Sequence, residues 1–84
     1  MKKILITGGA GYIGSHTAVE LVKAGFEPII IDDLSNSDIQ VLDRLEEITG
    51  KKLAFYKGDC SDRSLLDQIY AEHQITGIIH FAAF

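Results

Sequence analysis

A cluster of glycines between two apolar segments constrains this chain more than any other feature. The stretch 8–14 holds four glycines, follows the continuous apolar residues 4–6, and leads into residues 13–24, whose apolar side chains recur at helical spacing. A strand, a glycine turn and a helix in this order direct backbone N–H groups toward the space before the helix. Such a turn lets a phosphate approach the backbone, and Gly14 lets the helix pack closely against the strand.

The spacing of the glycines fits a dinucleotide better than a nucleoside triphosphate. Gly9-x-Gly11-x-x-Gly14 satisfies the dinucleotide-binding fingerprint, and Gly8-x-x-Gly11-x-x-Gly14 overlays it. Gly9 and Gly14 also have the spacing of a Walker A loop, but Ser15 stands where that motif needs Lys. On the glycines alone, a turn without a ligand remains an alternative.

An acidic residue at the end of the next apolar segment supports the dinucleotide interpretation. Asp32 follows residues 27–31 and lies 18 positions after Gly14, close to the offset of a ribose-binding acid. Its carboxylate would accept hydrogen bonds from ribose hydroxyls and repel a 2′-phosphate. Because no Arg or Lys occurs in residues 8–22 or 32–43 to neutralise that phosphate, the sequence favours NAD over NADP. The alternative role of Asp32 is that of a solvated loop acid.

The apolar pattern along the chain predicts an α/β fold. Continuous apolar runs indicate buried strands, and the segments between them have helical periodicity. The expected strands are residues 3–7, 27–31, 53–56 and 78–83. The expected helices are residues 13–24, a second helix from a capping box of Ser37 and Gln40 to Gly50, and a third from Ser61 or Asp62 to Gly77. Right-handed crossovers then give a doubly wound parallel sheet in the order 3-2-1-4 with three helices.

Helical and strand periodicity also assign individual side chains to the core. Ile13 of the first helix, Ile39 and Ile48 of the second, and Tyr70 of the third are expected to face inward. His80 lies within an apolar strand and is expected to be a core histidine with its hydrogen bonds satisfied, rather than a catalytic base.

Composition argues against several other classes of protein. The chain of 84 residues is 46% apolar and 24% charged, as expected of a globular domain. A net charge of −4 without a basic run gives no sign of nucleic acid, and no apolar run is long enough to cross a membrane. Cys60 is the single cysteine, which excludes an internal disulfide and suits the cytoplasm. It does not cluster with the three histidines, so no metal site is expected.

Four segments together resemble the UDP-glucose (UDP-galactose) 4-epimerases, which are extended short-chain dehydrogenases/reductases. These segments are Thr7–Thr17, Asp32–Ser37, Gly58-Asp59 and His80–Ala83. The resemblance covers the whole chain but only the N-terminal part of such an enzyme. It implies a Rossmann-like fold with the first four strands only, galactose metabolism, a UDP-sugar substrate and, at full length, a homodimer.

The resemblance also implies a reaction. NAD, held as a true cofactor, takes a hydride from C4 of the sugar of UDP-galactose or UDP-glucose, a 4-keto sugar turns over in the site, and the hydride returns to the other face. The family's catalytic Ser/Thr and its Tyr-x-x-x-Lys pair have no counterpart in this chain. We therefore expect residues 1–84 to be a partial NAD-binding Rossmann domain, the N-terminal part of a longer enzyme, inactive alone and without a second domain.

Carried over residue by residue, the resemblance assigns cofactor contacts and no catalytic residue. Those at the pyrophosphate are Gly8, Gly11, Tyr12, Ile13 and Gly14. Those at the adenosine ribose and its neighbouring phosphate are Asp32, Asn36 and Ser37. Asp59 and Cys60 would contact adenine, Cys60 through its backbone, and the pyrophosphate and nicotinamide side would be lined by Phe81, Ala82 and Ala83.

Two departures and two alternatives stay open. Asp33 stands where the family usually has Asn, and Ala83 stands where Gly is frequent. The glycine motif is shared with sister nucleotide-sugar dehydratases and decarboxylases, so a sister enzyme on the same scaffold is one alternative. A stand-alone, non-catalytic NAD- or nucleotide-binding module is the other.

Overall fold

Strands and helices alternate along the chain, as the apolar pattern predicts. The computed structural model describes residues 2–8, 10–34 and 39–81, and within them four parallel strands form one sheet in the order β3-β2-β1-β4. The elements are β1 (Lys3–Thr7), α1 (Tyr12–Lys23), β2 (Glu27–Asp32), α2 (Gln40–Thr49), β3 (Ala54–Lys57), α3 (Arg63–Glu72) and β4 (Ile75–His80). The predicted doubly wound order 3-2-1-4 is confirmed.

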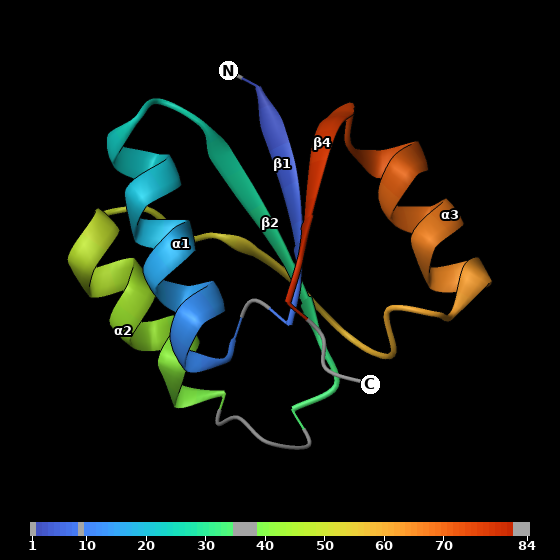
Figure 1. Cartoon of the computed structure of the whole chain (residues 1–84), viewed down its shortest axis with the longest axis horizontal. Helices are drawn as coiled ribbons and strands as arrows, with labels where there is room; N and C mark the ends of the chain where they lie inside the picture. The colour runs from blue at the N-terminus through green and yellow to red at the C-terminus, as the bar shows by residue number, and fades with distance from the viewer. Residues whose placement is uncertain (1, 9, 35–38, 82–84) are drawn as a thin grey trace.

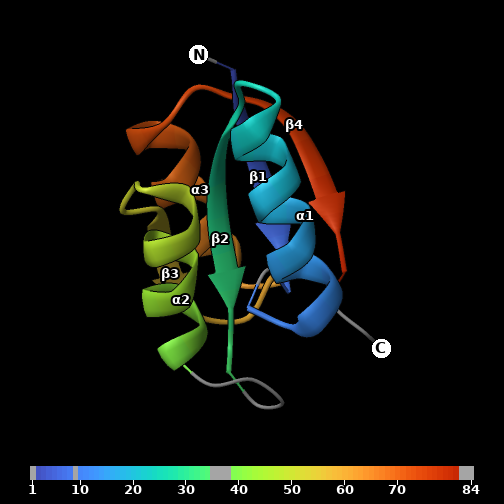
Figure 2. The ribbon, with the colours of Figure 1, turned by 90° about the vertical axis from the view of Figure 1, so that its left-hand side faces the viewer.

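The helices cover both faces of the sheet. In Figure 1 the sheet stands between α1 and α2 on one side and α3 on the other. Figure 2, turned by 90°, shows α1 and α2 in front of β2 with α3 behind it. This division follows from chain order. Two right-handed crossovers step one way from β1 to β3, and the third returns past β1 to β4, which places α3 on the opposite face.

The core consists of one apolar cluster on each face of the sheet. The cluster under α1 and α2 holds Ile6, Ala18, Ile30 and Leu45, and the cluster under α3 holds Leu5, Ile29, Ile31 and Ile69. Successive side chains of a strand point to opposite faces, so neighbouring residues of β1 and β2 serve different clusters. The continuous apolar runs of the sequence therefore reflect strands that are buried on both sides.

The edge strand β4 contains a register irregularity near its start. Lys3 is level with Ile75, but Ile4 is level with Gly77, so Thr76 is an extra residue in β4. The Thr76 Oγ1 donates a hydrogen bond to the carbonyl oxygen of Lys3, at 3.1 Å. A bulge of this kind leaves one residue outside the regular ladder and bends the strand locally.

The same strand corrects two predicted boundaries. β4 begins at Ile75 instead of residue 78, and α3 ends at Glu72 instead of near Gly77. Gly77 lies inside β4 rather than at a helix end, and a Cβ added there would lie 3.2 Å from Ile4 Cδ1. This glycine therefore serves close strand packing. In α2, the predicted capping box at Ser37 lies outside the described residues.

Several helical side chains that the periodicity assigned to the core are exposed. Ile13, Ile39, Ile48 and Tyr70 are all at least 45% exposed. Ile13 lies in the first turn of α1, beyond the end of the strands, and α2 packs through a narrow stripe that includes Leu45. A sheet of this width covers only part of each helix's apolar surface. None of the described helices combines the length and the apolar character needed to span a membrane.

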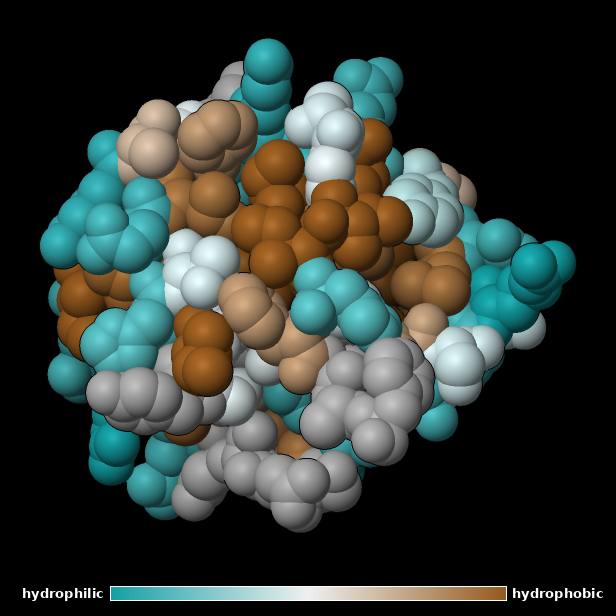
Figure 3. Space-filling view, viewed as in Figure 1, coloured by the Kyte–Doolittle hydropathy of each residue, from teal (hydrophilic) through white to brown (hydrophobic). Residues whose placement is uncertain are grey.

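An apolar surface is uncovered at the edge of the sheet. Figure 3 shows hydrophobic atoms gathered over β4 and β1, between the two helical layers. Ile78 of β4 is 54% exposed. The cluster under α3 is built mainly on β1 and β2, and from β4 it is Ile75, not Ile78, that packs against it.

Candidate cofactor site

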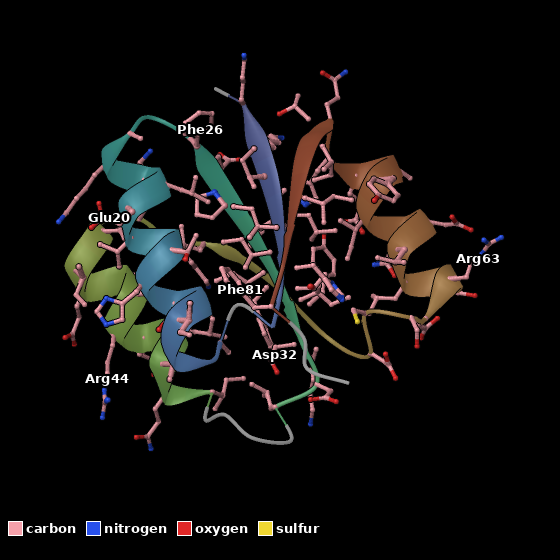
Figure 4. All side chains as sticks on the ribbon, viewed as in Figure 1. Glu20, Phe26, Asp32, Arg44, Arg63 and Phe81 are labelled. Carbon is pink, nitrogen blue, oxygen red and sulfur yellow. The ribbon has the colours of Figure 1, made fainter. Side chains whose placement is uncertain are left out.

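The predicted site residues approach one another at the carboxyl end of the sheet. Because the strands are parallel, β1, β2 and β4 end together, at Thr7, Asp32 and His80. Figure 4 shows Asp32 and Phe81 at this end and Phe26 at the opposite end. In open α/β sheets, ligands bind beyond the carboxyl ends of the strands.

The glycine turn is fixed to the neighbouring strand. Gly8 has a φ of 72°, in the left-handed region that costs other residues about 1–2 kcal/mol. Its N–H donates to the carbonyl oxygen of Ile31 at 2.8 Å, and its own carbonyl oxygen accepts from Gly11 N–H at 3.2 Å. Glycine at position 8 is therefore required by the backbone of the turn as well as by space for a ligand.

Helix α1 begins without a capping group of its own. Its N-cap residue is Gly11, which has no side chain to accept a hydrogen bond, and its first turn holds no acidic residue. By contrast, Asp62 caps α3 by accepting a hydrogen bond from Leu65 N–H at 3.2 Å. The first N–H groups of a helix lack intrahelical partners and carry partial positive charge. The start of α1 is thus suited to an anionic ligand, and the buried Gly14 lies in this turn.

Asp32 joins the glycine turn to the loop after β2. The residue is 9% exposed, with Oδ2 accepting from Ala10 N–H at 3.0 Å and Oδ1 accepting from Leu34 N–H at 2.8 Å. These contacts contradict the alternative of a solvated loop acid. Each carboxylate oxygen can accept more than one hydrogen bond, so Asp32 retains capacity for ribose hydroxyls.

The residues after β3 reach the same end of the sheet. Gly58 N–H donates to the carbonyl oxygen of Asp32 at 3.0 Å. Asp59 is exposed, and its Oδ1 accepts hydrogen bonds from the backbone N–H and the hydroxyl of Ser61, both at 2.8 Å. These bonds, the backbone one first, lower the pKa of the Asp59 carboxyl below its usual value. Cys60 follows as a free, half-buried thiol.

A polar pair that the sequence reasoning missed lies between β1 and β4. Thr7 is 4% exposed, and its hydroxyl is hydrogen-bonded to Nδ1 of His80. His80 is an exposed residue of the edge strand, so the expectation of a core histidine is wrong, although its ring does have a partner. The signal in the sequence is positional: each residue ends a strand and directly precedes a predicted site segment.

Some predicted contacts stay predictions. Asn36, Ser37, Ala82 and Ala83 lie outside the described residues, as does the side chain of Tyr12. Ile13 is exposed in the first turn of α1, and Phe81 is half-buried beside the glycine turn's strand. Across residues 2–8, 10–34 and 39–81, no three His, Cys, Asp or Glu side chains are grouped so as to hold a metal ion.

Comparison with known proteins places the chain in a family. Residues 5–84 match the family model described as GDP-mannose 4,6 dehydratase. The chain belongs to this family. It is 56% identical over 79 residues to the UDP-glucose 4-epimerase of Bacillus subtilis (strain 168), in a match that covers 94% of this chain and 23% of that protein.

Solved structures of this dehydratase and epimerase family share the fold. The UDP-glucose-4-epimerase from Stenotrophomonas maltophila, with bound NAD and formylated UDP-arabinopyranose, superposes with a TM-score of 0.94 at 44% identity, over 100% of this chain and 25% of that one. The UDP-glucose 4-epimerase from Bifidobacterium longum, in complex with NAD+ and UDP, gives 0.95 at 42% identity, over 99% and 25%. The Rossmann-like fold is confirmed, and the chain spans about a quarter of the length of these relatives.

Proposed function

We propose that this chain is the NAD-binding part of a UDP-glucose 4-epimerase, an enzyme that interconverts UDP-galactose and UDP-glucose. The observation that carries the proposal is the 56% identity to an epimerase across nearly the whole chain. The cofactor is supported by two solved relatives that hold NAD at TM-scores of 0.94 and 0.95. In this proposal residues 1–84 are a partial Rossmann domain of a longer enzyme.

The described residues fit a dinucleotide. The uncapped N-terminus of α1, with the turn from Gly8 to Gly11 before it, would bind the pyrophosphate. The carboxylate oxygens of Asp32, which each accept one backbone hydrogen bond, would each accept a further one from a hydroxyl of the adenosine ribose. Asp59 and the backbone of Cys60 would contact adenine. Bound NAD supplies the hydride acceptor, and then the donor, at C4 of the sugar.

The remaining predicted contacts complete the proposed cradle. Those at the pyrophosphate are Tyr12, Ile13 and Gly14, and those near the ribose are Asn36 and Ser37. Phe81, Ala82 and Ala83 would line the nicotinamide side. The exposed position of Ile13 supports its role, because a side chain in the first turn of α1 that is not needed by the core can contact a ligand.

Cofactor choice gives a first test. Asp32 is buried and already accepts two backbone hydrogen bonds, so a 2′-phosphate beside it would meet a fixed negative charge. We expect calorimetric titration of the chain to show NAD binding at least about tenfold tighter than NADP, a difference of about 1.4 kcal/mol. Equal affinity for the two cofactors, or no affinity for NAD, would contradict the NAD proposal.

The reaction gives the second test. A polypeptide that contains these residues, and the Tyr-x-x-x-Lys pair that the resemblance implies, should convert UDP-galactose to UDP-glucose. Residues 1–84 alone should bind NAD but convert nothing, because that pair is absent from them. Failure of the longer polypeptide to epimerise while still binding NAD would reject the epimerase and keep the cofactor site.

A dehydratase is the second candidate, because the matching family model is named for one. The products separate the two reactions. An epimerase returns a sugar nucleotide of unchanged mass, whereas a dehydratase returns one lighter by a water molecule. A stand-alone binding module would give neither product.

Location and assembly follow from the same proposal. We infer a cytoplasmic homodimer at full length that acts in galactose metabolism and has no nucleic-acid or membrane partner. The free Cys60 and the net charge of −4 support this inference. A monomer in sedimentation of the longer polypeptide would contradict the inferred homodimer.

A further inference from the structure

Thr7 and His80 form a hydrogen bond between residues 73 positions apart in the chain. They are level with each other in the register of β1 and β4, at the last position of each strand. Thr7 is 4% exposed, and a buried hydroxyl needs a hydrogen-bond partner. The ring of His80, at the end of the edge strand β4, provides it.

Each member of the pair directly precedes a segment of the proposed site. Gly8 follows Thr7 and begins the glycine turn, while Phe81 follows His80 and donates its N–H to the Thr7 carbonyl oxygen at 2.8 Å. Thr7 is therefore bonded to the end of β4 twice, through its backbone and through its side chain. The glycine turn and Phe81 cannot move apart without breaking one of these bonds.

The other flank of the turn has a matching anchor. On the β2 side, Asp32 Oδ2 accepts from Ala10 N–H and Ile31 accepts from Gly8 N–H. The β4 side has no carboxylate in the equivalent place among the described residues, and the Thr7–His80 bond takes that role. The turn is thus fixed from both neighbouring strands before a ligand binds, which reduces the conformational freedom that binding must remove.

We propose that Thr7 and His80 are a positioning pair that holds Phe81 at a fixed place beside the glycine turn, and so prepares the nicotinamide side of the site. The inference rests on the proposed function. The pair acts through the backbone of Gly8 and Phe81 and touches no cofactor atom itself. Loss of the pair should therefore weaken the binding of the nicotinamide half of the dinucleotide, near Phe81, more than the binding of the adenosine half, near Asp32.

The test compares two ligands on matched variants of the chain. Thr7→Val keeps the shape of the side chain and removes the hydroxyl, and we expect its NAD affinity to fall about tenfold, the effect of one lost hydrogen bond. AMP contains adenosine and one phosphate but lacks the nicotinamide half that reaches Phe81, so its affinity should stay within about twofold. Thr7→Ser restores the hydroxyl and should restore NAD affinity, which a role in packing alone would not explain.

His80→Ala removes the same hydrogen bond from the other side, and it tests the proposal even if Thr7→Val, a substitution of a buried residue, prevents folding. His80 is exposed, so this variant should fold and lose NAD affinity to the same extent. The double variant should be no weaker than either single one, because both remove the same bond.

The outcomes separate this inference from the proposed function. NAD affinity unchanged in both single variants, or NAD and AMP affinity reduced alike, would overturn the positioning role. Wild-type chain that binds neither NAD nor AMP would overturn the proposed cofactor site and this inference with it.

Discussion

The two ends of the sheet both carry polar side chains, but they use them differently. At the carboxyl end, Asp32 is buried and bonded to two backbone N–H groups, and Thr7 is buried and bonded to His80. At the amino end, an open cavity of about 570 Å³ lies beside Lys2 and the connection between Tyr70 and Thr76. This cavity therefore lies at the end of the sheet opposite the proposed site.

The difference shows that a cavity does not by itself mark the candidate site in this chain. Most residues that line the cavity at the amino end are exposed. The ion pair of Lys3 with Glu27, at 3.7 Å, is a partly exposed contact of small energy. Polar groups at the carboxyl end are instead fixed by partners in the glycine turn, in the loop after β2 and at the end of β4. The uncapped N-terminus of α1 supplies donors for an anionic group, and the fixed carboxylate of Asp32 beside it supplies acceptors for hydroxyl groups.

Removal of the Asp32 carboxylate should have the largest effect. Asp32→Ala removes two hydrogen bonds to a charged acceptor, at about 1.5–3 kcal/mol each, so we expect the free energy of unfolding to fall by about 3 kcal/mol or more. NAD affinity should fall as well. Urea denaturation measures the first effect and calorimetric titration the second.

Asp33→Ala is the matched control, because the neighbouring Asp33 is exposed. Its free energy of unfolding should change by no more than about 0.5 kcal/mol. An equal loss of stability in Asp32→Ala and Asp33→Ala would contradict the structural difference between the buried and the exposed carboxylate.

Two glycines with the same backbone shape test the two ends directly. Gly8 at the carboxyl end and Gly50 at the amino end have φ angles of 72° and 70°. Gly8→Ala and Gly50→Ala should each lower the free energy of unfolding by about 1–2 kcal/mol, because both place a Cβ in the left-handed region. NAD binding should weaken only in Gly8→Ala. A loss of NAD affinity in both variants would mean that general destabilisation, and not the site, controls binding.

The caps of α1 and α3 give a smaller contrast. Asp62→Ala removes the side-chain cap of α3 and should lower the free energy of unfolding by about 1 kcal/mol. The rise in melting temperature on adding NAD should be unchanged, because the phosphates are expected to bind at the N-terminus of α1 and not at α3. A reduced rise would place the ligand at α3 and contradict the site at α1.

Tyr56 should give the smallest effect, visible only at high pH. Its hydroxyl donates to Glu72 Oε2 at 3.2 Å and lies 2.9 Å from His73 Nε2, and the pKa of Tyr56 is raised by burial and then by the charge of Glu72. The protonated phenol is thus favoured in the folded chain. Its contribution is complete below the unfolded pKa near 10 and is lost as the pH rises through the folded pKa.

We therefore expect the stability of the native chain to decline above pH 10 more steeply than that of Tyr56→Phe, as measured by urea denaturation across that range. The exposed Tyr70, substituted as Tyr70→Phe, is the control. If the loss of stability above pH 10 persists in Tyr56→Phe but disappears in Tyr70→Phe, the assignment of this pH dependence to Tyr56 is wrong.

Much of the fold was predictable from local pattern. Ile29, Ile30 and Ile31 are fully buried because β2 lies inside a sheet covered on both faces, and such strands produce continuous apolar runs. The position of Asp32 at the carboxyl end then followed from chain order. Its contacts with Ala10 and Leu34 did not, because hydrogen bonds from a side chain to distant backbone depend on how the loops fold.

The errors have a common physical origin. Ile13, Ile48 and Tyr70 follow helical periodicity, but a narrow sheet cannot cover the whole apolar surface of its helices. Periodicity reports which face of a helix is apolar and not how much of that face meets the sheet. The start of β4 was missed because a bulge interrupts the strand pattern, and Gly77 was interpreted as a helix stop instead of a close contact within the sheet.

The bulge at Thr76 decides which side chains of β4 face α3. Ile75 packs against the cluster under α3, and His80, five residues later, is level with Thr7 on that same face. In a regular strand, residues an odd number of positions apart point to opposite faces, so only one of these two placements could occur. A single extra residue resets the alternation and allows one short strand to serve both the core at its start and the polar pair at its end.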